Sequence, residues 1–367
     1  MVKISVIIPV YNVKRYLKTC LDSVVNQSFQ DFEVICVNDG STDGSLEILK
    51  QYADNHDNIK IITKNNGGLG SARNAGLDAC LGDYIFFLDS DDYIDVNALE
   101  KLYENAISNG SDLVFNKIAR FNDQNNIDYK RPGYDFYKTF KDDDFSNLTF
   151  DYKDIKKHVL NSSFSAWSKL YNKSFLDKFD DFTFPQGIAY EDVLFHVKAV
   201  TRANRMSYVN EFLYFYRNNP NSIVNNNNGF DIFTVVDSVE DYLKTNNLTD
   251  EFEEEFKKFK IAQITNYVLI SQSDDYFQFA KKEIEDINLD DKSVLYRNRR
   301  KLYELFLECE NLYEYYTKYY NSEIDDLKQK NRKLKKEIKH LKKDNDSLKD
   351  EMAKKNKSKF KKIFPFQ

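Results

Sequence analysis

The sequence has few cysteines and histidines and no long hydrophobic run, and each of these absences excludes a class of protein. The four Cys among 367 residues have no paired spacing, which rules out a disulfide framework and a CxxC zinc site. Four His are too few for a His-rich metal centre. No apolar stretch approaches the ~18 residues of a membrane span, and the run Ile4–Val10, broken by Pro9, is too short for a signal peptide. We therefore expect a reduced, cytoplasmic protein.

The composition is that of a folded globular chain. Hydrophobic residues make up 41% and charged residues 31%, with only 11 Gly and 5 Pro, so the sequence is not of low complexity. The length predicts roughly two to three domains. The formal net charge of −6 argues against a general nucleic-acid binder, so no nucleic-acid partner is expected.

The first hundred residues alternate short apolar runs with segments of helical period. The runs are typical of strands buried on both faces, and they are Ile4–Val10, Phe32–Val37, Ile59–Thr63 and Tyr84–Leu88. Helices are expected between them, at Val13–Asn26 and Ser45–Tyr52. This order predicts βαβ units and a parallel sheet, in which ligands bind beyond the carboxyl ends of the strands.

Polar residues follow three of these runs, at Tyr11-Asn12, at Asn38-Asp39 and at Asp89-Ser90-Asp91-Asp92. Clustered carboxylates repel one another unless a cation lies between them, and hard oxygen ligands suit Mn²⁺ or Mg²⁺. The alternative is that Asp91 or Asp92 caps a helix that starts near Val96. The second acidic strand end, at Asp39, favours one site built from all three strand ends.

The later sequence predicts further elements with less detail. A strand is expected at Asp112–Ile118 and another at Tyr208–Arg217, with helices at Ala166–Leu176 and Glu191–Val200. Residues 120–160 are acidic and irregular. From Phe230 to Tyr320 the chain reads as helices with aromatic residues and Leu at helical spacing, without a chemical motif.

An unbroken heptad pattern follows. Its a and d positions are Ile324, Leu327, Asn331, Leu334, Ile338, Leu341, Asn345, Leu348 and Met352. Leu at d with Asn at two a positions favours a parallel two-stranded coiled coil with a second copy of the chain. Three of the four g–e′ pairs have opposite charge, and they are Glu323–Lys328, Glu337–Lys342 and Asp344–Lys349. The alternative is a lone surface helix.

The last fourteen residues, Lys354–Gln367, combine six Lys with Phe and Ile and contain no acid. The rest of the chain is acidic, so the charge is strongly asymmetric. We expect this tail to bind an anionic membrane surface, with the protein attached peripherally to the inner face of the cell membrane. A disordered, solubilising tail is the alternative.

Four ordered motifs in the first hundred residues carry a specific resemblance. They are Lys3–Asn12 (KISVIIPVYN), Val37–Asp43 (VNDGSTD), Asn66–Leu77 (NGGLGSARNAGL) and Tyr84–Asp92 (YIFFLDSDD). With Trp167–Leu176, Glu191-Asp192 and Tyr216-Arg217, they resemble bacterial or archaeal family 2 glycosyltransferases of the GT-A fold, of the surface-polysaccharide or cell-wall type. The resemblance covers roughly residues 1–225 and implies a Rossmann-like α/β fold with a mostly parallel sheet flanked by helices. A helical region and the coiled coil would follow.

The resemblance implies a role for each matching residue. Asp192 would be the catalytic base, Asp91 and Asp89 the DxD pair that holds Mn²⁺ or Mg²⁺, and Asp39 the residue that reads uracil. Asn66 and Arg73 would line the base and ribose pocket. The implied nucleotide-sugar-binding set is Pro9, Tyr11, Asp39, Asn66, Arg73, Asp89, Ser90, Asp91, Arg217 and Ser222. From its residue type alone, Asp192 is more typical of a helix cap.

The resulting hypothesis is a metal-dependent inverting glycosyltransferase that moves a sugar from a nucleotide-diphosphate donor to a polysaccharide or lipid-linked glycan. One alternative is an inactive, dimeric nucleotide-sugar-binding scaffold. A nucleotidyltransferase is disfavoured because no Gly-rich loop follows the first strand. The expected divisions are a nucleotide-binding half at 1–110, an acceptor half at 111–225, a helical region at 226–320, the coiled coil at 321–353 and the tail at 354–367.

Overall fold

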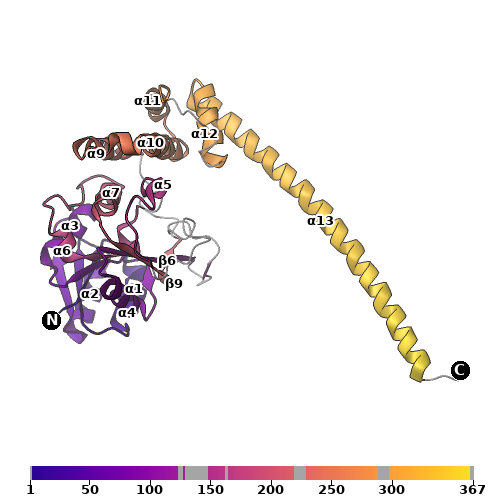
Figure 1. Ribbon diagram of the computed structural model, residues 1–367, viewed down its shortest axis with the longest axis horizontal. Helices are drawn as coiled ribbons and strands as arrows, with labels where there is room; N and C mark the ends of the chain where they lie inside the picture. Colours follow the sequence, from indigo (N-terminus) through magenta and orange to yellow (C-terminus); the bar gives the residue numbers. More distant parts are fainter. Residues whose placement is uncertain are drawn as a thin grey trace. The chain divides into compact units, whose positions relative to one another are not determined.

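The computed structural model describes residues 2–122, 127–128, 148–161, 164–218, 229–287 and 297–363. It divides into two compact units, residues 1–295 and residues 296–367. The first unit holds a mixed sheet and its covering helices, and the second holds two helices (Figure 1). The finer divisions expected at residues 110, 225, 320 and 353 stay predictions.

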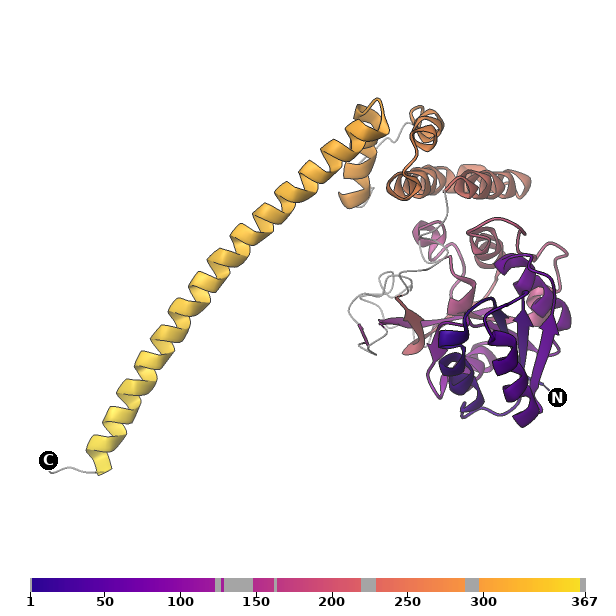
Figure 2. The same cartoon turned by 180° about the vertical axis from the view of Figure 1, so that it is seen from behind.

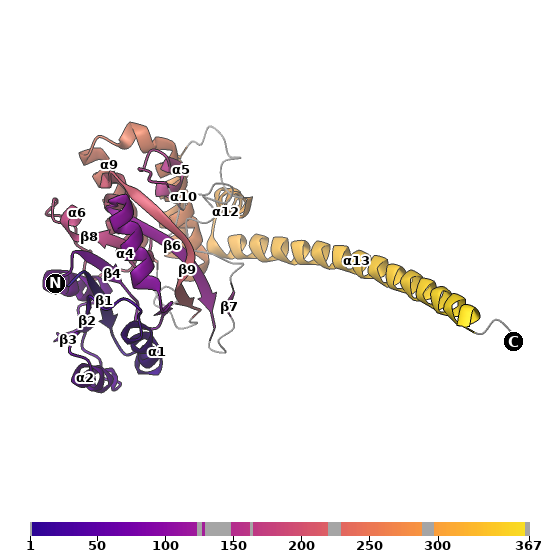
Figure 3. The ribbon, with the colours of Figure 1, turned by 60° about the horizontal axis from the view of Figure 1, so that its bottom comes forward.

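Parallel strands open the first unit, as the sequence predicts. They are β1 (Ile4–Val10), β2 (Phe32–Asn38), β3 (Ile59–Thr63) and β4 (Tyr84–Phe87), in the spatial order β3-β2-β1-β4 (Figure 3). The connecting helices are α1 (Lys14–Val25), α2 (Ser45–Asn55) and α3 (Leu69–Ala79). Every residue of β1 and β2 is buried, which explains their continuous apolar runs.

The second half of the sheet is mixed, so the expectation of a mostly parallel sheet holds only for the first half. The order continues with β8 (Lys169–Asn172), β6 (Leu113–Phe121), β9 (Met206–Arg217) and β5 (Tyr93–Ile94), and β7 (Ile127–Asp128) pairs with β6. Strand β8 runs antiparallel to β4 and to β6, while β6 and β9 run parallel. The strands expected at Asp112–Ile118 and Tyr208–Arg217 are confirmed as β6 and β9.

The helix expected over Ala166–Leu176 is wrong. A short 3₁₀ turn (Ala166–Ser168) leads into strand β8, and one helical turn, α6 (Lys173–Leu176), follows. Trp167, Leu170 and Tyr171 are spaced as on a helix. Leu170 and Tyr171 are nevertheless both buried because β8 lies between β4 and β6, and Trp167 is buried in the preceding 3₁₀ turn. A short apolar segment buried on both faces has no informative period, so its sequence does not distinguish a strand from a helix.

The remaining helices of the first unit agree in part with the helical expectations. Helix α4 (Ala98–Asn109) follows β5, and α5 (Lys156–Val159) is a single turn in a stretch for which the sequence predicted no element. Helix α7 (Asp192–Arg202), before β9, confirms the helix expected at Glu191–Val200. Helices α9 (Asp231–Thr245), α10 (Thr249–Ser271) and α11 (Asp274–Ile284) pack in sequence against one another, and α9 also packs against α7 (Figure 1). The hydroxyls of Thr201 on α7 and Tyr242 on α9 are 2.7 Å apart.

The second unit is a pair of helices, α12 (Arg297–Glu308) and the long α13 (Leu312–Ile363) (Figure 2). The rings of Phe306 and Tyr315 meet edge to face, and Lys301 pairs with Glu323 and Asp326. The predicted heptad segment is therefore helical throughout. Among the residues that the structure describes, no helix is both long and apolar enough to cross a membrane.

Candidate active site

The carboxyl ends of β1, β2 and β4 come together at one edge of the sheet, as predicted. The backbone N–H of Asp39 donates to the carbonyl of Val10 at 2.9 Å, and the Thr42 N–H donates to the side chain of Asn12 at 2.8 Å. Pro9 is buried within β1, whereas the Tyr11 side chain is 52% exposed at its end. The polar residues that follow each strand therefore share one surface.

The carboxylate of Asp39 is buried beneath the glycine-rich loop between β3 and α3. It accepts backbone N–H groups from Gly67, at 3.0 Å and 3.1 Å, and from Gly68 at 2.9 Å, and it pairs with Lys64 at 2.7 Å. Sequence reasoning missed Lys64. Gly68 has a φ of +85°, a conformation that side chains disfavour. Asp39 thus shapes the loop that carries the exposed Asn66.

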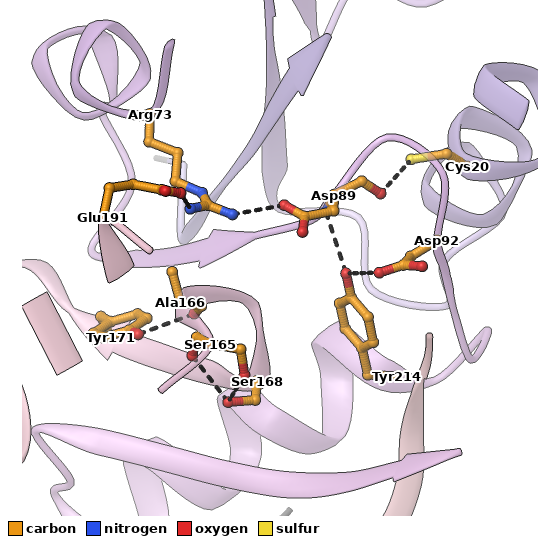
Figure 4. Close-up of polar contacts among 10 residues, drawn as sticks. All are labelled: Cys20, Arg73, Asp89, Asp92, Ser165, Ala166, Ser168, Tyr171, Glu191 and Tyr214. Atoms are coloured by element: carbon orange, nitrogen blue, oxygen red, sulfur yellow. Dashed lines mark hydrogen bonds and ion pairs between the residues drawn. The ribbon is translucent and has the colours of Figure 1, made fainter. Parts of the chain in front are cut away.

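Arg73 lies in a buried position between two acidic segments (Figure 4). One guanidinium nitrogen is 2.8 Å from Asp89 of the DxD pair, and the other pairs with Glu191, directly before α7. The guanidinium carbon is 5.5 Å from the ring centroid of Phe184. Its opposing charges and hydrogen bonds raise the pKa of Arg73 although burial acts against this. Arg73 is therefore a cationic link between the two acidic segments, and its expected contact with a nucleotide stays a prediction.

Asp192 is the first residue of α7, beside this link. It is partly exposed, and burial raises the pKa of its carboxyl to about 7, with a further increase from Glu191. Arg73 acts in the opposite direction, and so does Lys169, whose ammonium is fully buried. Burial also raises the pKa of Glu191. A carboxyl with a pKa near neutrality can accept a proton at physiological pH.

The third acid of the acidic cluster has a structural role. The buried carboxylate of Asp92 accepts from the Tyr214 hydroxyl and from the backbone N–H of Arg217, both at 2.7 Å (Figure 4 shows the first). Burial, with the nearby charges of Asp91 and Asp89, raises its pKa well above the usual range. Asp92 therefore fastens the loop to β9, and the alternative that Asp91 or Asp92 caps the following helix is wrong, because the N-cap residue of α4 is Asn97.

Arg217 reinforces the same attachment. Its Nε donates to the carbonyl of Asp91 at 2.7 Å, and its guanidinium lies between two rings, 4.4 Å from the centroid of Tyr16 and 4.3 Å from that of Phe121. The residue is buried at the end of β9. Its expected part in nucleotide-sugar binding stays a prediction, and Ser222 lies outside the described residues.

Asp89 and Asp91 are the residues that fit a divalent cation. Both are partly exposed at the end of β4, and their oxygens are the hard ligands that Mn²⁺ and Mg²⁺ prefer. Ser90 between them is buried. In the described part of the chain, no group of three or more His, Cys, Asp or Glu side chains could enclose a metal ion. A cation at this loop would therefore need ligands from elsewhere, such as phosphate oxygens.

Comparison with known proteins identifies the family to which the N-terminal sequence is similar. Residues 5–179 match the sequence profile of glycosyl transferase family 2. The chain carries a family 2 glycosyltransferase domain. Four curated glycosyltransferases match it at 33–37% identity, and the matched segments span 30–62% of their lengths. One is the poly(ribitol-phosphate) β-glucosyltransferase of Bacillus spizizenii, which is 37% identical over 58% of this chain and 32% of its own length.

Solved structures support the GT-A fold of the family 2 domain, and their similarity covers more of the chain than the family match does. TarS 1–349 of S. aureus, in complex with UDP-GlcNAc, matches with a TM-score of 0.57 and 20% identity, over 83% of this chain and 90% of that one. The mannosyltransferase PcManGT of Pyrobaculum calidifontis, in complex with GDP-Man and Mn²⁺, matches with a TM-score of 0.54 and 14% identity, over 86% of each chain.

Proposed function

We propose that this chain is a metal-dependent, inverting glycosyltransferase that transfers a sugar from a UDP-sugar to a hydroxyl of a surface polysaccharide, glycolipid or cell-wall polymer. The observation that carries the proposal is the Asp192 carboxyl at the start of α7. It is partly exposed, its pKa is raised to about 7, and Glu191 and Arg73 connect it to the acidic loop at Asp89. A proton acceptor thus lies close to residues suited to a diphosphate leaving group.

Asp192 would take the proton of the acceptor hydroxyl as that oxygen attacks the anomeric carbon, a role worth about 10²–10⁴ in rate. Inversion follows when the base and the leaving group lie on opposite faces of that carbon. Mn²⁺ or Mg²⁺, held by Asp91 and Asp89, would supply charge neutralisation for the departing diphosphate. Asp92 and Arg217 keep the acidic loop in place during this step.

The loop between β3 and α3 is the proposed base and ribose site. Asp39 contributes by fixing the backbone of Gly67 and Gly68, so that the exposed Asn66 and Tyr11 face a donor across the strand ends. Direct recognition of uracil by Asp39 would require its carboxylate to exchange the contact with Lys64 for one with the base. The polymer acceptor is proposed from the relative that acts on poly(ribitol-phosphate), as its name states.

Donor turnover and donor binding, measured on the same variants, test the proposal. Wild-type protein with Mn²⁺ is offered UDP-glucose, UDP-galactose and UDP-GlcNAc, and release of UDP is followed with water as acceptor. Asp192→Asn should keep its affinity for UDP and lose roughly 10²-fold or more in turnover. Asp54→Asn, at an exposed acid of α2, is the matched control and should behave as wild type. Turnover of Asp192→Asn within threefold of wild type would show that another group is the base.

A second variant tests whether UDP binding depends on a divalent metal ion. Asp91→Asn should bind UDP no better with Mn²⁺ than with a chelator, because the carboxylate that holds the cation is lost. Undiminished, metal-dependent affinity in this variant would refute the metal assignment. If the wild-type protein binds UDP-sugars but turns over none of them, the inactive scaffold is the better description.

We further propose that the enzyme is a parallel dimer through α13. The apolar residues Ile324, Leu327, Leu334, Ile338 and Leu341 are between 47% and 65% exposed on this helix, so a second helix would remove a continuous stripe from water. Of the complementary g–e′ pairs, Glu323–Lys328 competes with the contact between Glu323 and Lys301 on α12. The pair Glu337–Lys342 would fix the parallel register, and Asp344–Lys349 would compete with the 3.9 Å contact between Asp344 and His340.

Two parallel helices would present two copies of the basic tail, residues 354–367, at the same end. Each Lys near an anionic surface contributes about 1 kcal/mol, less after screening by salt, and pairing raises avidity without new contacts. We propose that this tail attaches the cytoplasmic enzyme to the inner face of the membrane. The full chain should float with anionic vesicles at low salt, and a chain lacking residues 354–367 should not. Equal flotation of both would exclude the tail as the anchor.

A further inference from the structure

The segment that leads into the proposed base, residues 184–191, is held on one side by α3. The side-chain amide of Asn74 donates to the carbonyl of Phe184 and accepts from its N–H, both at 2.8 Å. Gly70 lies so close that a Cβ atom there would be 2.2 Å from the Pro185 carbonyl oxygen and 3.3 Å from the Glu191 side chain. No residue larger than glycine fits at this position without moving the segment.

Helices α9 and α10 also contact this segment. The carboxylate of Asp231, the first residue of α9, accepts the backbone N–H of Ala189 at 2.9 Å. The ring of Tyr267, on α10, packs against the ring of Tyr190 with centroids 4.7 Å apart. Two consecutive residues directly before the acidic pair are therefore fixed by the helical region, for which the sequence offers no motif.

Tyr190 needs this support because its backbone is in the left-handed region, with a φ of +63°. That conformation is costly for a residue with a large side chain, and it persists only where the surroundings enforce it. Directly after Tyr190, Glu191 pairs with Arg73 and Asp192 begins α7. A relaxed Tyr190 would therefore turn both carboxylates away from their present positions.

We propose that helices α9 and α10 position the Asp192 carboxylate, and that Asp231 is the positioning residue that fixes the segment 188–191 through the Ala189 N–H. The proposal rests on the proposed function, in which Asp192 is the base. It assigns the helical region a part in the reaction without contact with donor or acceptor.

The test compares two substitutions at one position. Asp231→Asn keeps an oxygen that can accept the Ala189 N–H, whereas Asp231→Ala removes it. Asp275→Ala, at an exposed acid in the first turn of α11, controls for the loss of a favourable charge at a helix start. Turnover of UDP-sugars with Mn²⁺, affinity for UDP, and amide hydrogen exchange of residues 186–191 are measured for each.

Asp231→Ala should lower kcat by roughly 10–100-fold, as expected when a reacting group is misplaced by about 1 Å. Its affinity for UDP should stay within about twofold, and exchange in 186–191 should be at least about tenfold faster. Asp231→Asn should recover most of kcat and of the protection, and Asp275→Ala should match wild type. A general structural defect would lower the affinity for UDP together with kcat, and Asp231→Asn would not rescue it.

Three results would overturn the proposal: wild-type kcat in Asp231→Ala, unchanged exchange in that variant, or an Asp231→Asn variant as impaired as Asp231→Ala. If Asp231→Ala does not fold, Tyr267→Leu decides, because it removes the ring that packs against Tyr190 and leaves Asp231 and the strained Tyr190 in place. Undiminished kcat in Tyr267→Leu would then refute the positioning role of the helical region. Failure of the proposed function is distinguishable, since it appears as full turnover in Asp192→Asn, and the exchange measurement needs no turnover at all.

Discussion

Replacement of Arg73 by Met should destabilise the first unit strongly. The guanidinium is 1% exposed and compensates two carboxylates, those of Asp89 and Glu191, whose side chains are 22% and 7% exposed. Met fills a similar volume but leaves both acids without a cation. Removal of one partner from a buried ion pair costs about 3–5 kcal/mol.

The lower end of this range is expected because Glu191 can escape part of the penalty by taking up a proton. Burial already raises the pKa of Glu191, whereas the charge of Arg73 lowers it. The loss of Arg73 would therefore raise the pKa of Glu191 further. A loss of about 3 kcal/mol corresponds to a fall in Tm of roughly 5 °C for a unit of this size. The fall should be smaller at pH 5 than at pH 8, since protonated Glu191 needs no counter-charge.

Thermal unfolding followed by circular dichroism at both pH values measures the effect. Lys101→Met is the matched control, because Lys101 pairs with Glu211 at the surface, where an ion pair contributes about 0–1 kcal/mol. The double variant Arg73→Met/Glu191→Gln should recover part of the loss. If Arg73→Met lowers Tm no more than Lys101→Met, Arg73 is not the electrostatic link described above.

Two further predictions concern the base and the long helix. Turnover should rise with pH to a plateau above about 7, where Asp192 is ionised. Glu191→Gln should shift this rise to lower pH, because the neighbouring charge that raises the pKa of Asp192 is gone. A pH profile that does not shift in this variant contradicts the assignment of Asp192 as the base. The full chain should sediment as a dimer, whereas Leu334→Lys combined with Leu341→Lys should give a monomer that still binds UDP, and Lys336→Ala, at an f position, should stay dimeric. A monomeric or trimeric wild-type chain contradicts the two-stranded parallel coil.

Much of the N-terminal sheet was predictable because its signals are local. Strands β1 and β3 have the predicted bounds, and β2 and β4 differ by one residue at their ends. Each is a run of apolar residues between turns, and such a run forms a buried strand wherever a parallel sheet surrounds it. The polar ends of β1, β2 and β4 then had to meet, because parallel strands place their carboxyl ends on one edge.

The sequence by itself therefore determined the order of the first strands and helices, the acidic edge with Asp39 and Asp89, and the helical course of the heptad segment. Only the tertiary structure decided that β8 is a strand, because a segment buried on both faces has no periodicity to read. The tertiary structure also decided that Arg73, which pairs with Asp89, pairs with Glu191 as well, 118 residues after Arg73 in the sequence. It likewise decided that Asp92 bonds to Arg217, 125 residues further along the chain. Such contacts depend on how the whole chain closes, and no local preference of a residue specifies its distant partner.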